Sequence, residues 1–253
     1  MTSCVIGHTG FIGGHLVEKF KPAACFNSKN ISDIAGQHFD TVYCAGNSGT
    51  KWMANKNPED DWKNIKYLIG CLNEIRANRF ILISTIDVYT NPFDITEEYI
   101  DKSGKQSPYG LHRYRFETFV RQRFENYNIL RLPIVYGRNF KKNILFDLIN
   151  NHELEKLDSR ARVQLYHVDN IDKDVEKIIA NDIEIINISA EPITVGEIAN
   201  NVFGFSLDKK HDEPFSTDMR SKYGSLYGTN DGYLYSKEST LNEIRQFVLS
   251  ECK

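Results

Sequence analysis

The sequence predicts an α/β fold in which a doubly wound parallel sheet is joined to a small C-terminal lobe. Apolar runs of strand length alternate along the chain with segments whose apolar residues recur at helical spacing, and most connections are short. A glycine-rich turn separates the first strand from the first helix. The chain has 253 residues, which is enough for a full hydrophobic core.

The glycine-rich turn follows an apolar strand at residues 3–6 and precedes a helix that begins near Phe11. Gly7 allows a sharp turn at the end of the strand, and Gly13 allows the helix to pack closely. Gly10 lacks a Cβ atom, so the backbone can approach a pyrophosphate there, which the positive end of the helix also attracts. Strand, turn and helix together predict a dinucleotide site of the Rossmann type, rather than a glycine turn without a ligand.

The composition excludes several classes of protein. The net charge is −3 and no basic stripe with interleaved aromatic residues occurs, which argues against nucleic-acid binding. No apolar run approaches the ~18 residues that span a bilayer, and the first strand follows Met1 too closely for a signal peptide. The cysteines form no Cys-X-X-Cys pair, and no metal-ligand spacing occurs. The cysteines are Cys4, Cys25, Cys44, Cys71 and Cys252. We therefore expect a cytoplasmic protein with reduced thiols and no metal, nucleic-acid or membrane partner.

Apolar patterning predicts the remaining elements. Strands are expected at residues 23–26, 40–46, 79–83, 127–136 and 184–189, and helices at 62–75, 144–150, 172–180, 194–202 and 239–249. Thr194 and Glu197 have the spacing of a capping box. Residues 47–58 are expected to form a long polar loop, in which Lys51 and Trp52 either cover a substrate or belong to an ordinary surface loop.

The end of the second strand bears on the choice of cofactor. A carboxylate about 20 residues after the glycine turn commonly binds the adenosine ribose. This chain instead has Asn27, Ser28 and Lys29, whose donors and positive charge suit a 2′-phosphate. The sequence thus slightly favours NADP(H) over NAD(H), with an ordinary polar turn as the equally weighted alternative.

Several segments resemble the extended short-chain dehydrogenase/reductases, a family that includes nucleotide-sugar epimerases, dehydratases and reductases. Residues 7–17 resemble the family's cofactor loop, and residues 40–46 are similar to its Asp-X-Val-X-X-X-Ala-Ala element. Residues 129–137 resemble its Leu-Arg-X-X-X-Val-Tyr-Gly element, and residues 165–171 its Phe-X-His-Val-X-Asp-Val element. The resemblance covers residues 2–202.

The resemblance implies a nicotinamide dinucleotide cofactor. The expected cofactor-binding residues lie in the glycine turn, at the ends of the second and third strands, and in later motifs. They are Gly7, Thr9, Gly10, Phe11, Ile12, Gly13, Asn27, Ser28, Lys29, Ala45, Gly46, Asn64, Tyr109, Arg113 and Pro133.

The catalytic residues are expected in two further motifs. Residues 84–89 resemble the family's Ser-Ser-X-X-Val-Tyr element, which places Thr85 at the catalytic hydroxyl position. Residues 109–117 resemble its Tyr-Gly-X-Ser-Lys element followed by Glu, with Arg113 in place of the lysine. At this spacing on a helix, Tyr109 and Arg113 share one face. We expect Tyr109 to be the acid or base, Thr85 to hold the reacting oxygen, and Arg113 to orient the ribose and lower the pKa of Tyr109.

The expected substrate-binding residues are Thr85, Asp87, Lys142 and Asn143. Lys142 and Asn143 precede a predicted helix, where they either bind a substrate phosphate or form a solvated loop. Dehydratases of the family usually carry an Asp-Glu pair directly after the catalytic hydroxyl residue. Here Ile86 and Asp87 follow Thr85, which favours a reductase or an epimerase.

These observations predict a Rossmann-type domain at residues 1–137 and a small substrate lobe at 138–253, with segments near 165–189 returning to the sheet. The expected function is that of an NAD(P)-dependent oxidoreductase or epimerase acting on a nucleotide-sugar or related carbohydrate, with a homodimer as the candidate assembly. Because Arg113 replaces the lysine, a non-catalytic dinucleotide-binding sensor or scaffold of the same fold is the alternative.

Overall fold

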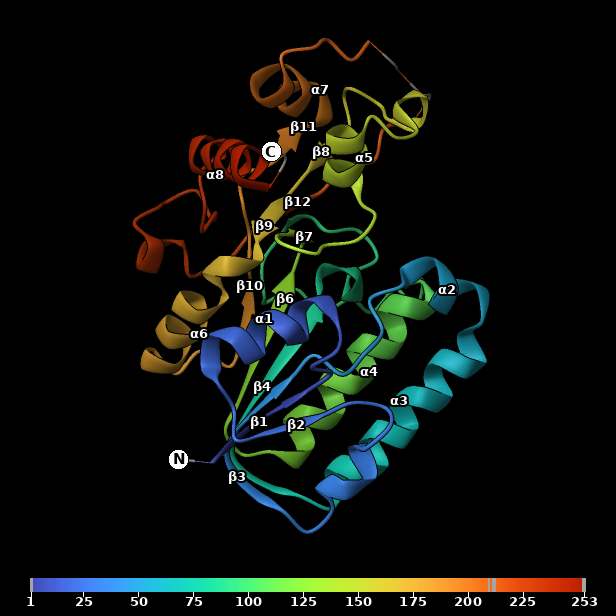
Figure 1. Cartoon of the computed structure of the whole chain (residues 1–253), viewed down its shortest axis with the longest axis vertical. Helices are drawn as coiled ribbons and strands as arrows, with labels where there is room; N and C mark the ends of the chain where they lie inside the picture. The colour runs from blue at the N-terminus through green and yellow to red at the C-terminus, as the bar shows by residue number, and fades with distance from the viewer. Residues whose placement is uncertain (1, 209, 211–212, 252–253) are drawn as a thin grey trace. The chain divides into compact units, whose positions relative to one another are not determined.

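The computed structural model of the chain describes residues 2–208, 210 and 213–251, so Cys252 lies outside the described residues. The chain forms two compact units (Figure 1). The first consists of Met1–Thr90, Ile100–Arg131 and Ile171–Ile186, and the second of Asn91–Tyr99, Leu132–Asn170 and Asn187–Lys253.

The first unit is built on a six-stranded sheet with the order β10-β6-β4-β3-β1-β2. Its strands are β1 (Ser3–Ile6), β2 (Ala24–Phe26), β3 (His38–Cys44), β4 (Arg76–Thr85), β6 (Tyr127–Leu132) and β10 (Ile185–Asn187). The pairs β1–β2, β1–β3 and β3–β4 are parallel, with Ile6 opposite both Phe26 and Cys44. The expected doubly wound parallel sheet is therefore confirmed, and the ends of β1, β3 and β4 lie at one edge.

Helices cover both faces of this sheet, as Figure 1 shows for α1 and α6 on one face and α3 and α4 on the other. The helices of the first unit are α1 (Phe11–Phe20), α2 (Lys51–Lys56), α3 (Pro58–Asn73), α4 (Pro108–Arg123) and α6 (Ile171–Ala180). Between α3, α4 and the sheet lies a core of fully buried side chains that includes Leu72, Phe80 and Phe116. Proline in the first turn favours the start of both α3 and α4.

The described residues of the second unit form three short strand pairs and three α-helices. Its strands are β5 (Phe93–Ile95), β7 (Ile134–Tyr136), β8 (Arg162–Val163), β9 (Leu165–His167), β11 (Ile193–Thr194) and β12 (Asp218–Met219). Its helices are α5 (Ile144–Asn150), α7 (Val195–Ile198) and α8 (Lys237–Glu251). Strand β7 pairs with β9, β8 with β11, and β5 with β12. A separate apolar core, with Tyr136, Val163 and Ile244 among its buried residues, holds this unit together.

The structure differs from the sequence prediction at three places. The loop expected at residues 47–58 contains the short helix α2. Pro133 divides the single strand expected at residues 127–136, because proline has no N–H group for the ladder. This segment of the first unit ends at Arg131, one residue before the end of β6, whereas the sequence placed the boundary at residue 137; the later segment of the unit is Ile171–Ile186. The capping box of Thr194 and Glu197 is present, but the α-helix after it ends at Ile198 and continues as a π-helical turn.

Within the described part of the chain, no helix is long and apolar enough to cross a membrane. The same residues contain no cluster of His, Cys, Asp and Glu suited to a metal ion. The four cysteines that the structure describes are free thiols, and burial raises the pKa of Cys4 and of Cys44.

Candidate active site

The glycine turn between β1 and α1 is packed tightly against the backbone around it. Gly7 has a φ of +88°, and a Cβ atom there would lie 2.3 Å from the carbonyl oxygen of Ala45. A Cβ atom on Gly13 would lie 2.0 Å from the carbonyl oxygen of Gly7. Both positions therefore admit only glycine, and the turn comes into direct contact with the end of β3.

The start of α1 is open to a ligand. Its N-cap residue, Gly10, makes no side-chain capping bond, and the first turn contains no acidic residue. A Cβ atom on Gly10 would lie 3.3 Å from the Gly7 carbonyl oxygen, a tight contact but a much longer one than those at Gly7 and Gly13. Thr9 is exposed, and Phe11 and Ile12 are half-buried at the first turn. These features fit the pyrophosphate of a dinucleotide.

The tip of β2 is a tight polar turn. The Asn27 side-chain oxygen accepts a hydrogen bond from the Lys29 backbone N–H at 2.8 Å, and the Asn27 N–H donates to the Asn30 side chain at 2.7 Å. Ser28 and Lys29 are exposed. The side-chain oxygen of Asn27 thus shapes the turn, while the hydroxyl of Ser28 and the ammonium of Lys29 face solvent.

The end of β4 carries a hydrogen-bonded chain of polar side chains. The Thr85 hydroxyl donates to Asp87 Oδ2 at 3.2 Å and accepts from the Asp87 N–H at the same distance. Lys51, on α2, donates from Nζ to Asp87 Oδ1 at 2.5 Å. The Lys51 side chain is 50% exposed and that of Asp87 28% exposed, so these hydrogen bonds connect Thr85 to a solvent-exposed ammonium group.

Helix α4 brings Tyr109 to the end of β4. Asn55, on α2, accepts a hydrogen bond from the Tyr109 N–H at 3.0 Å, and Ser107 caps the helix by accepting from Gly110. A Cβ atom on Gly110 would lie 1.9 Å from the carbonyl oxygen of Asp87, so only glycine permits this approach. The Thr85 side chain is near enough to the Tyr109 phenol to lower its pKa.

Arg113 lies one turn after Tyr109 and is 3% exposed. Its guanidinium carbon lies 3.9 Å from the centre of the Tyr109 ring. Nη1 donates to Asp61 Oδ2 at 2.5 Å, and Nη2 donates to the carbonyl oxygen of Ser48 at 2.6 Å. Ser48 follows shortly after Ala45, which contacts the glycine turn, so Arg113 links α4 to the segment beside the predicted cofactor site.

The pKa of Tyr109 is raised above the usual value of a tyrosine. Burial is the largest cause, and it outweighs the opposing effect of Arg113; the charges of Asp87 and Asp61 also raise the pKa, while the hydrogen bond to Thr85 lowers it. Arg113 therefore acts in the expected direction, but the loss of water outweighs it, and the net pKa lies above that of a free tyrosine. At neutral pH the phenol carries its proton.

A buried ion pair between Arg131 and Glu117 joins the elements that carry the site. Arg131, on β6, donates from Nη2 to Glu117 Oε2 at 2.6 Å and from Nη1 to the Tyr89 hydroxyl at 2.5 Å. Ser84, beside Thr85, donates to Glu117 Oε1 at 2.5 Å. Burial alone would lower the pKa of Arg131, but Glu117 and Tyr89 raise it overall, so the guanidinium stays charged. The pair ties α4 to both β4 and β6.

Other predicted residues have different surroundings. Asn64 is exposed on α3, and the residue of α3 that reaches Arg113 is Asp61. Pro133, Lys142 and Asn143 belong to the second unit. Asn143 caps α5 by accepting from the Phe146 N–H, and Lys142 donates to Glu153. A role for these four residues in binding cofactor or substrate stays a prediction.

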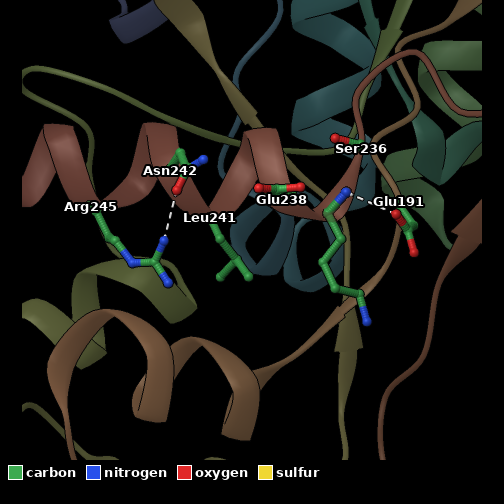
Figure 2. Close-up of a pocket in the computed structure, with 7 residues that line it drawn as sticks. Glu191, Ser236, Glu238, Leu241, Asn242 and Arg245 are labelled. Carbon is green, nitrogen blue, oxygen red and sulfur yellow. Dashed lines mark hydrogen bonds between the residues drawn. The ribbon is translucent and has the colours of Figure 1, made fainter.

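The second unit has a surface hollow of about 500 Å³ (Figure 2). Its described lining contains no predicted site residue and consists of Glu191, Ser236, Lys237, Glu238, Leu241, Asn242 and Arg245. Figure 2 shows the hydrogen bond from Arg245 to Asn242, of 2.7 Å, and that from the Lys237 N–H to Glu191, of 2.9 Å. The Lys237 ammonium also pairs with Glu197 at 2.9 Å. These charges stabilise α8 and the capping box of α7, which explains the polar lining without a ligand.

Sequence reasoning missed the role of Asp61 and of Asn55. Asp61 is one of three acidic residues in the first turn of α3, where acidic residues commonly stabilise a helix start. Helical spacing distinguishes Asp61 from its two neighbours, because it lies on the same face of α3 as the buried residues Ile65, Leu68 and Leu72. Asn55 was missed because the sequence predicts a loop at residues 47–58. In the structure Asn55 lies on α2 and accepts a hydrogen bond from the start of α4.

The comparison with protein families matches residues 23–188 to the NAD dependent epimerase/dehydratase family. The match spans more than half of the chain, and it includes Thr85, Tyr109 and Arg113. The chain therefore belongs to this family of NAD-dependent enzymes, as the sequence motifs predict. The comparison with curated proteins returned no match.

Solved structures confirm the fold over the whole length of the chain. A UDP-glucose 4-epimerase from Thermotoga maritima, solved with UDP-glucose, is 18% identical with a TM-score of 0.72, and 98% of each chain is covered. A dTDP-4-dehydrorhamnose reductase from Bacillus anthracis, solved with NADP, is 15% identical with a TM-score of 0.74 over 99% of each chain. A UDP-glucuronic acid 4-epimerase from Bacillus cereus, solved with NAD, is 20% identical with a TM-score of 0.67 over 100% of each chain.

Proposed function

We propose that this chain is an NAD(P)-dependent reductase or epimerase that acts on a nucleotide-sugar or a related carbohydrate. The observation that carries the proposal is the arrangement of Thr85, Tyr109 and Arg113 at the end of β4, linked through Ser48 to the segment that contacts the glycine turn. The three similar structures act on or bind nucleotide-sugars or nicotinamide cofactors, according to their descriptions, which supports the substrate class.

The residues divide the chemistry among them. The glycine turn and the start of α1 would hold the pyrophosphate, and Arg113 would bind the ribose side of the dinucleotide, which supplies or accepts a hydride. Thr85 binds the oxygen of the reacting carbon, and Tyr109 gives that oxygen its proton when a carbonyl is reduced. The proton to be given is present at neutral pH, because the pKa of Tyr109 lies above the usual value of a tyrosine.

The test is turnover with a panel of nucleotide-sugars, followed through the absorbance of the reduced cofactor and through separation of the products. Turnover of a member of the panel would support the proposal. Cofactor binding without turnover of any member would favour the alternative, a non-catalytic sensor or scaffold, for which the replacement of lysine by Arg113 is the motivating feature. A cytoplasmic homodimer completes the proposal; the free thiols suit a reducing compartment.

Replacing Gly10 with valine is expected to weaken cofactor binding at least about tenfold, or about 1.4 kcal/mol. The added side chain would stand at the open start of α1, while Gly10 has ordinary extended dihedral angles that valine also adopts. Titration calorimetry with NADP(H) measures the effect. Gly14→Ala is the matched control, because a Cβ atom there makes only an ordinary contact at 3.8 Å. Equal affinity in Gly10→Val and the parent would remove the turn from the site.

We also propose that NADP(H) binds more tightly than NAD(H), because the tip of β2 offers Ser28 and Lys29 and no carboxylate. Lys29→Glu is expected to lower NADP(H) affinity about tenfold and to leave NAD(H) affinity within about twofold, since only the 2′-phosphate meets this charge. Fluorescence titration with both cofactors gives the four dissociation constants. Lys66→Glu, at an exposed position on α3, makes the same change of charge elsewhere. Tighter binding of NAD(H) to the parent chain would contradict the preference.

A further inference from the structure

The guanidinium of Arg113 is fixed at two of its three nitrogens. Asp61 accepts from Nη1 at 2.5 Å, and the Ser48 carbonyl accepts from Nη2 at 2.6 Å. Nη1 also lies 3.4 Å from the carbonyl oxygen of Tyr109. Nε is buried, and among the described residues it has no hydrogen-bond partner. A guanidinium is planar, so fixing both terminal nitrogens also fixes the direction of the remaining N–H.

Asp61 carries the negative charge that faces the guanidinium of Arg113. It is 9% exposed, and its Oδ2 also lies 2.7 Å from Nδ1 of His112, the residue before Arg113. A buried carboxylate requires a charged or hydrogen-bonding partner, because burial without one is costly. Asp61 and Arg113 thus depend on each other, and the pair joins α3 to the face of α4 that carries Tyr109.

We propose that Asp61 is a positioning residue of the active site, which holds Arg113 so that its Nε–H remains available to the bound cofactor. This inference rests on the proposed function. On this proposal, Arg113 can take the place of the lysine because Asp61 holds its guanidinium in position. The two residues form a matched pair that replaces the single lysine of the family motif.

A lysine at position 113 would behave differently beside Asp61. Its ammonium has one nitrogen on a flexible stem, so it cannot bridge the carboxylate and the Ser48 carbonyl while presenting a further donor in a fixed direction. The buried carboxylate would attract the ammonium and hold it away from the cofactor. Removing the charge of Asp61 would release the lysine. We therefore expect Asp61→Asn to weaken cofactor binding when residue 113 is arginine and to strengthen it when residue 113 is lysine.

Four proteins test this expectation: the parent chain, Asp61→Asn, Arg113→Lys, and the two changes combined. The dissociation constant of NADP(H) is measured for each by fluorescence titration, and kcat and KM are measured separately where turnover occurs. We expect Asp61→Asn to weaken cofactor binding about tenfold in the parent, in the range of mutations that remove an orienting partner. In the Arg113→Lys background, the same change is expected to strengthen binding severalfold.

Matched variants separate positioning from general damage. Asp60→Asn makes the same change at an exposed position on the same turn of α3, and Arg115→Lys makes the same change at an exposed position on α4. Both are expected to leave cofactor affinity within about twofold of the parent, as surface substitutions usually do. Asp61→Glu keeps the charge and is expected to bind cofactor more tightly than Asp61→Asn. A purely structural role would weaken binding in both backgrounds and would not produce the change of sign.

The outcomes distinguish this inference from the proposed function. A parent chain that binds cofactor, combined with an Asp61→Asn effect that is absent or has the same direction in both backgrounds, would overturn the role of Asp61 alone. A parent chain that binds no nicotinamide dinucleotide would overturn the proposed function, and the inference with it. A change of sign would establish Asp61 and Arg113 as a functional pair.

Discussion

Replacing Tyr109 with phenylalanine is expected to lower kcat by about 10²- to 10⁴-fold, the range that a positioned acid or base contributes. The substitution removes only the phenol hydroxyl and keeps the ring on which the guanidinium of Arg113 lies, 3.9 Å from its centre. The affinity for NADP(H) is therefore expected to stay within about twofold of the parent. Steady-state kinetics and fluorescence titration measure the two quantities on the same preparations.

Tyr114→Phe provides the control for Tyr109→Phe, because it removes a phenol hydroxyl from the same helix at a position outside the site. The control is expected to keep full turnover. Full turnover in Tyr109→Phe would refute the catalytic assignment, whereas a loss in both variants would indicate disturbance of α4. The pH dependence adds a second measure: because the pKa of Tyr109 is raised, reduction is expected to decline only at alkaline pH, above the usual range of a tyrosine.

The sheet and its order of elements could be predicted because they depend on local patterns. Residues 3–6 and the glycines after them specify a strand, a turn and a helix within one short segment, and the structure has each at the expected place. The division into units was less predictable. The chain leaves the sheet at Pro133, but nothing local indicates that residues 91–99 join the second unit, where β5 pairs with β12 far along the chain.

The site could be predicted as a set of motifs, but the partners that set its chemistry could not. The spacing of Tyr109 and Arg113 places them on one face, and the structure confirms their contact. The sign of the pKa shift depends on how much water is excluded and on Asp61 and Asp87, which come from α3 and the end of β4. Such contacts between elements distant in sequence leave no periodic signal in a single chain.

Two motif residues without an expected function have a structural explanation. Glu117 of the tyrosine motif and Arg131 of the later Leu-Arg motif form the buried pair below the site, and Tyr89 of the Val-Tyr motif bonds the same guanidinium. Their contacts hold β4, α4 and β6 in a fixed arrangement. The motifs therefore contain residues of the proposed active site at the end of β4 and residues that hold β4, α4 and β6 together.

Glu117→Gln is expected to destabilise the folded chain by about 3 to 5 kcal/mol, because it leaves the charge of Arg131 buried without a counterion. The Arg131 and Glu117 side chains are only 5% and 1% exposed, so water cannot replace the lost partner. For a chain of this size, such a loss corresponds to a decrease in Tm of about 6 °C or more. Thermal unfolding followed by circular dichroism provides the measurement.

The control and a second variant keep this last expectation testable even if Glu117→Gln folds poorly. Glu184→Gln removes an exposed carboxylate that accepts from the Tyr127 hydroxyl at 2.9 Å, and it is expected to change stability by about 0.5 kcal/mol or less. The double variant Glu117→Leu with Arg131→Met removes both charges and is expected to lose less stability than either single change, since neither charge remains unpaired. Additive losses in the double variant, or a Glu117→Gln protein as stable as the Glu184→Gln control, would show that the buried pair does not hold α4 to the sheet.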